Sequence, residues 1–355
     1  ASGSPENIRT FLPAVAASLA RLPLDRLELE AGILRAEAAR LERSQFTVIL
    51  ATLFGSRGPG VELHEEWGLQ TQGPAAVQAW ADEHFTSGNA VLMLSGPPPE
   101  GLRFDLPSGS RKVFHLPEPG IDHRPAQMEA RGIQQAGLAL GTLIPRSVAA
   151  ALAVPLAGLR LTEKLRHELG LAYTVAQVYL PLDPEVALAY LGADCEPTRR
   201  LEMGERFILA LRELAESGPT DAEMEKTDSA IPDPELVDPI MLARSELQRY
   251  GLDHLLGSPH LTLPEWIEAH GRTDRDSIKE VVREIAEHAC VIVPEPGLSS
   301  VAAREEVDEP TVDAIESTRV PGPGPGDVVS LAVGDAGVSI HRDGLMKTVK
   351  WEDVT

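Results

Sequence analysis

An arginine and a tyrosine lie seven residues apart in the segment LRHELGLAYTV, residues 165–175. Arg166 offers a planar fork of hydrogen-bond donors, and Tyr173 offers one hydroxyl. Side chains of these two types can together hold a peptide carbonyl or stabilise a developing oxyanion. A second interpretation is also open, in which Arg166 favours a helix C-terminus and Tyr173 packs against its neighbours.

A helix-to-strand corner is predicted to position this pair. Leucines repeat at helical spacing up to the corner: Leu161, Leu165 and Leu169. Gly170 is predicted to be the residue that ends the helix. The following segment, LAYTVAQVYL, is rich in β-branched and aromatic residues, as is typical of a strand. Such a corner can aim the side chains of Arg166 and Tyr173 into one space.

Two glutamates share one edge of a second predicted helix, RLELEAGILRAEAARLE at residues 26–42. The apolar stripe of this helix is Leu27, Leu34, Ala38 and Leu41. Glu30 and Glu37 each follow a stripe leucine by three residues, so we expect them two turns apart on a half-buried edge. A carboxylate there needs a partner such as a metal or a cation. The alternative is that both make surface ion pairs.

The histidines do not supply a zinc motif. The sequence has ten of them, and no two lie four residues apart, which excludes both H-E-x-x-H and H-x-x-E-H. Cys195 and Cys290 are too isolated to form a metal-binding pair. We therefore assign no catalytic residue in this chain.

Two parts of the chain repeat the same order of elements. Residues 4–30 and 196–225 each read as a long amphipathic helix, a turn and an acidic helix start, and residues 75–102 and 276–298 each read as helix, short strand and Pro/Gly exit. We predict an α+β protein with two homologous α/β sandwich domains. The opening of the second has no counterpart in the first, so the first domain is expected to be incomplete at its N-terminus.

Composition shifts set the predicted boundaries. We expect the C-terminal part of the first domain over residues 1–105, a linker over 106–129, the second domain over 130–304, an acidic Pro/Gly linker over 305–327 and a short β-rich tail over 328–355.

Charge and cysteine content narrow the function classes. The chain has 355 residues, is 43% hydrophobic and carries a net charge of −22, which argues against a nucleic-acid or anionic-membrane partner. The longest apolar stretch, residues 147–161, contains a proline and is too short to span a bilayer. Two cysteines do not make a disulfide framework, so we expect a reduced, cytoplasmic setting.

The segment LRHELGLAYTV resembles the second-domain signature of the insulinase/pitrilysin family of zinc metallopeptidases. ESGPTDAEMEK, residues 216–226, also resembles the family, with Thr220 as the helix N-cap and Glu223 three residues later. The resemblance covers roughly residues 4–301. It departs from the family in LAGLRLTEKL, which stands where the family has a glycine-rich stretch.

This resemblance implies roles for four residues. It implies that Arg166 and Tyr173 bind a peptide substrate, that Glu37 is the third zinc ligand of the complete protein, and that Glu30 is its neighbour. A lone carboxylate does not hold zinc, so zinc is expected in the complete protein and not tightly in this chain alone.

The resemblance leads to a hypothesis and two alternatives. The hypothesis is a zinc-dependent metalloendopeptidase whose H-x-x-E-H segment is not in this chain. The first alternative is a non-catalytic subunit of the family that lends the Arg/Tyr pair to a homologous, metal-bearing partner. A third interpretation is a structural assembly protein that does not bind peptide.

Overall fold

The computed structural model describes residues 3–38, 44–55, 57–63, 72–119, 126–129, 137–229, 238–293, 305–306, 318–321, 330–334, 337–342 and 345–350. It divides into two compact units, each assembled from segments that are separated in sequence. Unit 1 takes Ala1–Leu41, Glu65–His115 and Ile231–Ile267; unit 2 takes Glu42–His64, Leu116–Ala230 and Glu268–Thr355. Each unit contains residues from before and after the predicted linker at 106–129. The units are therefore not the domains predicted along the sequence, whose boundaries stay a prediction.

Helices are the regular elements in the described part of unit 1, and residues 90–115 are without helix or strand. Its elements are α1 (Pro5–Ala20), η1 (Leu24–Arg26), α2 (Leu27–Ala38), α4 (Pro74–His84), η4 (Ser87–Asn89), α8 (Pro239–Leu256) and the first part of α9 (Leu263–Arg272). The hydroxyl of Ser4 caps α1 by accepting from the backbone N–H of Asn7 at 3.3 Å. The end of α1 is tied to α4, because the backbone N–H of Leu22 donates to Gln78 Oε1 at 3.1 Å.

Unit 2 is built on a mixed sheet of six strands. They are β1 (Ala126–Glu129), β2 (Leu138–Pro145), β3 (Val175–Pro181), β4 (Val186–Ala193), β5 (Cys290–Val293) and β6 (Glu305–Glu306), in the order β3-β4-β2-β5-β1-β6. Antiparallel pairs join β3 to β4, β4 to β2 and β2 to β5, whereas β1 pairs parallel with β5 and β6. The α+β fold class predicted from the sequence is confirmed.

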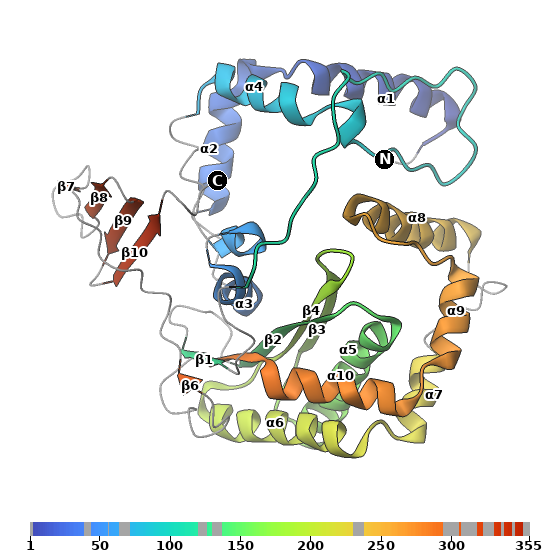
Figure 1. Cartoon of the computed structure of the whole chain (residues 1–355), viewed down its shortest axis with the longest axis vertical. Helices are drawn as coiled ribbons and strands as arrows, with labels where there is room; N and C mark the ends of the chain where they lie inside the picture. Colours follow the sequence, from blue (N-terminus) through green and yellow to red (C-terminus); the bar gives the residue numbers. More distant parts are fainter. Residues whose placement is uncertain are drawn as a thin grey trace. The chain divides into compact units, whose positions relative to one another are not determined.

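Helices cover the two faces of this sheet. The helical elements of unit 2 are α3 (Gln45–Phe54), η2 (Gly58–Leu63), α5 (Val148–Leu161), η5 (Thr162–Glu168), η6 (Pro197–Arg199), α6 (Arg200–Ser217), α7 (Asp221–Ser229) and α10 (Arg275–His288). Helices α5, α6 and α10 pack on one another and against the sheet, and α3 packs against β2 and β5 on the other face (Figure 1). In α10 the side chains of Ile278, Val282 and Ile285 repeat at helical spacing, and all three are fully buried.

The core beneath α3 explains one glycine in the central strand. Phe54 and Ile49 of α3 are fully buried against β2. A Cβ atom at Gly141 would lie 2.5 Å from the Ile49 side chain, so only glycine allows this helix to approach the strand so closely. On the same side Phe46 meets the ring of Tyr190 edge to face at 5.3 Å.

A second, antiparallel sheet forms the end of the chain. Its strands are β7 (Thr318–Pro321), β8 (Ser330–Gly334), β9 (Gly337–Arg342) and β10 (Leu345–Lys350), in the order β10-β9-β8-β7. Strands β8, β9 and β10 fall within residues 328–355, where the sequence predicts a short β-rich tail. The structure adds short strands inside both predicted linkers: β1 within 106–129, and β6 and β7 within 305–327.

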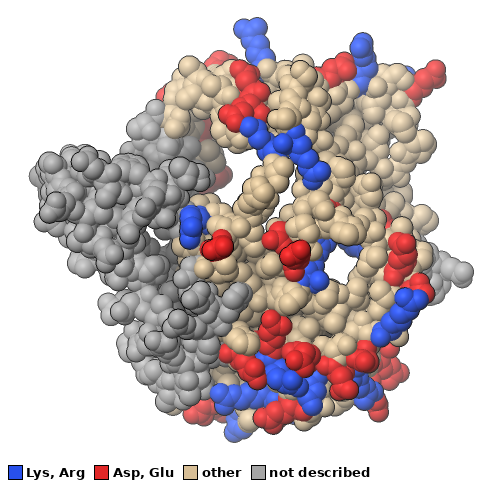
Figure 2. All heavy atoms as spheres, in the orientation of Figure 1, with Lys and Arg blue, Asp and Glu red and all other residues tan. Residues whose placement is uncertain are grey.

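The surface of unit 2 carries charges of both signs. Lys, Arg, Asp and Glu side chains are interspersed over the lower part of the visible face, where α6 and α10 lie (Figure 2). Interspersed charges are typical of a solvated surface.

None of the helices in the described part of the chain has the length and apolarity needed to cross a membrane.

Candidate substrate-binding corner

The candidate site lies where α5 runs into β3. Helix α5 begins at the Ser147 cap, whose hydroxyl accepts from the backbone N–H of Ala150 at 3.0 Å. The helix continues without a break into η5, which carries Arg166. The chain then turns at Gly170 and passes through Tyr173 before β3 starts at Val175. The predicted helix-to-strand corner is confirmed.

The end of the helix is wound more loosely than predicted. Residues Thr162–Glu168 form a π-helix, which closes with the backbone N–H of Leu169 donating to the carbonyl of Lys164 at 3.1 Å. The three leucines that repeat at helical spacing differ in burial: Leu161 and Leu165 are fully buried, whereas Leu169 is 39% exposed. The five-residue hydrogen-bond step of the π-helix rotates Leu169 away from the α-helical stripe.

The turn after the π-helix is fixed by its backbone. Gly170 has φ 57°, as its predicted place at the helix end requires. The carbonyl of Leu165 accepts from the backbone N–H groups of both Leu171, at 2.7 Å, and Ala172, at 3.2 Å. Leu171 and Ala172 are buried, so the corner is anchored just before Tyr173.

Arg166 and Tyr173 meet on the outside of this corner. The guanidinium carbon of Arg166 lies 5.2 Å from the centroid of the Tyr173 ring, within the range of a cation–π contact. The side chain of Arg166 is exposed, and Tyr173 is 78% exposed. This surface contact also fits the alternative in which Tyr173 packs against its neighbours. The structure places both groups together at the surface, where their N–H and O–H donors face solvent.

Asp194, which the sequence analysis did not single out, holds the other side of the corner. Its Oδ1 atom accepts from the backbone N–H groups of Tyr173 and Thr174, each at 2.8 Å. Its own backbone N–H donates to the carbonyl of Thr174 at 3.1 Å. Arg199 adds a bond from Nη1 to the carbonyl of Gly170 at 3.3 Å. An aspartate directly after the apolar strand LAYLGA is the only local signal of this role.

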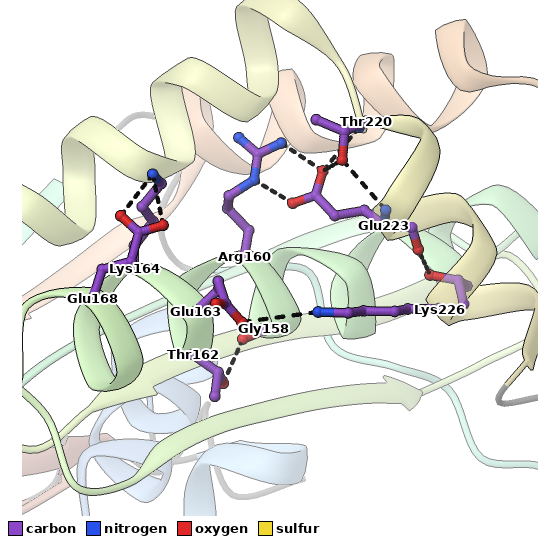
Figure 3. Close-up of polar contacts among 10 residues, drawn as sticks. Gly158, Arg160, Thr162, Glu163, Lys164, Glu168, Thr220, Glu223 and Lys226 are labelled. Carbon is purple, nitrogen blue, oxygen red and sulfur yellow. Dashed lines mark hydrogen bonds and ion pairs between the residues drawn. The ribbon is translucent and has the colours of Figure 1, made fainter.

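A nearly buried ion pair supports the helix that leads into the corner. Arg160, near the end of α5, makes a bidentate pair with Glu223 of α7: Nε bonds Oε1 closely, and Nη2 lies 2.6 Å from Oε2 (Figure 3). Their side chains are only 11% and 13% exposed. Planar two-point pairing fixes orientation as well as distance, so α5 and α7 are held in one register.

The predicted helix cap at α7 is confirmed and joins this pair. The backbone N–H of Thr220 donates to Glu223 Oε2 at 2.8 Å, and the backbone N–H of Glu223 donates to Thr220 Oγ1 at 3.3 Å. Burial by itself raises the pKa of the Glu223 carboxyl, but hydrogen bonds from Arg160 and Thr220 outweigh it and hold that pKa below its ordinary value. Glu223 is therefore charged at neutral pH.

The two candidate metal-site glutamates lie on α2 in unit 1. Both side chains are exposed, and Glu30 pairs with Arg26 at 3.0 Å. The expectation of a half-buried edge is wrong, because Leu34 of the neighbouring stripe is itself 43% exposed in the described structure. For Glu30 the geometry is that of the surface-pair alternative.

The residues present do not fit a zinc ion. In the described part of the chain, His, Cys, Asp and Glu side chains nowhere gather in threes that could hold a metal. Zinc in proteins takes three or four such ligands, and Glu37 alone supplies one.

Comparison with known proteins rests on structure. The sequence matches no family model and no curated protein. The peptidase M16 inactive domain from Pseudomonas fluorescens superposes with a TM-score of 0.64 at 13% identity, covering 82% of this chain and 78% of that chain. The first half of the periplasmic protease PqqL from Escherichia coli gives 0.56 at 13% identity, covering 84% and 72%.

A longer protease shows how much of such a protein this chain spans. Pitrilysin matches with a TM-score of 0.52 at 14% identity, covering 94% of this chain but 42% of its own. At these identities the likeness concerns the fold and not the chemistry. The chain has the fold of M16 and pitrilysin-type peptidase domains.

Proposed function

We propose that this chain binds peptides at the Arg166–Tyr173 corner, as the substrate-binding part of an M16-type peptidase. The observation that carries the proposal is the pairing of an exposed arginine with an exposed tyrosine on a turn whose backbone is fixed. Exposed aromatic and arginine side chains are the types that dominate protein recognition surfaces.

The chemistry of the pair suits a peptide backbone. The Arg166 fork can donate to a carbonyl from two N–H groups, and the Tyr173 hydroxyl can donate to a second acceptor. The contact between the guanidinium and the ring orients the fork. Because the turn is tied to buried Leu171 and Ala172, little ordering of the backbone is required when a peptide binds.

Hydrolysis requires zinc ligands and a base that the described part of this chain does not bring together. We propose that zinc and an H-x-x-E-H segment come either from a homologous partner subunit or from another part of a longer protein. Glu37 as a zinc ligand and Glu30 as its neighbour belong to that proposal. The cytoplasmic location predicted from the cysteines also stays a proposal; Cys195 and Cys290 are not joined in a disulfide.

Peptide binding is the direct test. A fluorescein-labelled unstructured peptide, in a lysine-rich and a glutamate-rich version, is titrated with the chain and its anisotropy measured. We expect saturable binding that Arg166→Ala weakens by about tenfold, the effect of one or two lost hydrogen bonds. Arg206→Ala, which removes an exposed arginine from α6, is the control. No saturable binding of either peptide, or equal affinity in the two variants, would refute the proposal.

A further inference from the structure

The position of Tyr173 depends on its backbone more than on its side chain. The side chain is 78% exposed, and residues 171–174 belong to neither η5 nor β3. A ring with so few packing contacts cannot anchor the chain that carries it. The groups that fix the Tyr173 backbone therefore decide where its hydroxyl lies.

Asp194 fixes that backbone from the end of the neighbouring strand, β4. One carboxylate oxygen of Asp194 accepts the N–H groups of both Tyr173 and Thr174 at 2.8 Å. Charge-assisted bonds of this length are about twice as strong as neutral ones. Asp194 directly follows the end of β4, which is buried over almost its whole length, so the carboxylate is itself held on a rigid element.

The hairpin at the opposite end of the same strand pair repeats this arrangement. Oδ1 of Asp183 accepts from the backbone N–H groups of Glu185, at 2.8 Å, and Val186, at 2.6 Å. Asp183 thus uses the same chemistry to close the β3–β4 turn, away from the Arg166–Tyr173 corner. The two aspartates differ in what they position and not in how they bond.

We infer that Asp194 is a positioning residue for peptide binding, acting through Tyr173. The inference rests on the proposed function of the corner. The two amide bonds hold Tyr173 beside Arg166. Without them the turn is still anchored at Leu171 and Ala172, but the Tyr173 backbone after that anchor can shift the hydroxyl away from the guanidinium.

A set of variants separates positioning from general stability. Asp194→Ala is expected to weaken binding of the labelled peptide by about tenfold, and Asp194→Asn, which keeps an oxygen acceptor, to restore most of the affinity. Asp183→Ala removes an equivalent pair of bonds and is expected to lower the melting temperature without changing affinity. If Asp194→Ala does not fold, Asp194→Glu replaces it. This substitution keeps the charge but moves the oxygen, and it is also expected to weaken binding of the labelled peptide.

A double-mutant cycle shows whether Asp194 acts through Tyr173. In a Tyr173→Ala background, Asp194→Ala is expected to change affinity by less than about twofold, because the group that it positions is gone. A loss of affinity that persists in that background would overturn the inference. So would parent-like affinity in Asp194→Ala, or an equal loss in Asp183→Ala.

Hydrogen exchange tests the positioning role of Asp194 independently of peptide binding. In the peptide-free chain, Asp194→Ala is expected to speed exchange at the Tyr173 and Thr174 amides and to leave the amides of β4 unchanged. If the parent chain binds no peptide but this exchange is faster, the proposed function fails and Asp194 still positions the corner. Unchanged exchange at both amides would overturn the inference by itself.

Discussion

At the scale of single residues, one substitution, Tyr173→Phe, tests whether the Tyr173 hydroxyl has a part in catalysis. Tyr173→Phe removes one oxygen from a ring that is already exposed, so the fold has little to lose. In an assembly that includes the metal-bearing partner or segment, we expect kcat to fall by about 10²-fold if the hydroxyl meets charge that develops in the transition state. The measurement is kcat and KM together with the melting temperature.

Arg166→Lys is the companion change in that assembly. It keeps the charge but loses the planar fork, and we expect a loss similar to that of Tyr173→Phe. Arg206→Lys on α6 is the matched control. Near-parent turnover in both Tyr173→Phe and Arg166→Lys would leave the corner without a part in catalysis.

The sequence predicts local pairs better than distant ones. Arg166 and Tyr173 could be identified because a single turn separates them, and the residue types on either side of Gly170 define that turn. Asp194 could not be identified in the same way, because its bonds to Tyr173 and Thr174 depend on the pairing of β3 with β4. The burial of Glu30 was wrongly predicted, because helical periodicity shows which side of a helix is apolar but not whether another element covers it.

At the scale of elements, the Arg160–Glu223 pair joins the helix that carries Arg166 to the next helical layer. Glu223→Ala removes the partner of the Arg160 guanidinium, and the Arg160 side chain is only 11% exposed. We expect the free energy of unfolding to fall by about 3 kcal/mol. Glu280→Ala, which breaks the exposed pair with Arg283, is expected to cost less than about 1 kcal/mol. Equal costs in chemical denaturation would contradict a structural role for the buried pair.

The same pair predicts a direction for pH dependence. The pKa of Glu223 is held below its ordinary value in the folded chain. Its contribution to stability is therefore fully present above the ordinary glutamate pKa and is lost as the pH falls through the lower, folded-state pKa. The difference in melting temperature between the parent and Glu223→Gln should accordingly shrink as the pH is lowered into that acidic range. A difference that grows on acidification would reverse the sign and exclude this mechanism.

The elements themselves were largely predictable, with one instructive exception. Thr220 predicts the start of α7, and the β-branched and aromatic residues after Gly170 predict β3. The π-helical turn of η5 was not predicted, because Leu161, Leu165 and Leu169 fit α-helical spacing in sequence. The looser turn forms where the chain must leave the helix and bring Tyr173 beside Arg166. π-Helical segments are frequent at functional sites for such reasons.

At the scale of the whole molecule, the fold class followed from the order of elements, but the strand order did not. Strand β5 comes about 150 residues after β2 in sequence and still pairs with it, and no local pattern encodes such a partner. No local pattern in the sequence predicts that α3 belongs to unit 2 either. Its apolar face fits the sheet through the gap that Gly141 leaves, a match that only the folded chain reveals.

The spacing of the histidines along the whole chain leads to a prediction about zinc. We expect this chain, purified after chelator treatment and dialysis, to hold less than stoichiometric zinc by elemental analysis and to leave peptides uncleaved. The reason is chemical: the sequence has no two histidines four residues apart, and zinc needs three or four ligands with a base beside it. Stoichiometric zinc, or cleavage that a chelator abolishes and zinc restores, would contradict this prediction and show that the chain holds a complete metal site.

The same experiment decides the role of Glu37 once a metal-bearing partner or segment is present. A carboxylate ligand contributes only when the other ligands are in place, so Glu37→Gln should then lower zinc occupancy and activity. Glu28→Gln, on the same exposed helix α2, should change neither. Equal effects of the two substitutions would remove Glu37 from the proposed metal site and leave the Arg166–Tyr173 corner as the only contribution to a peptidase that we propose for this chain.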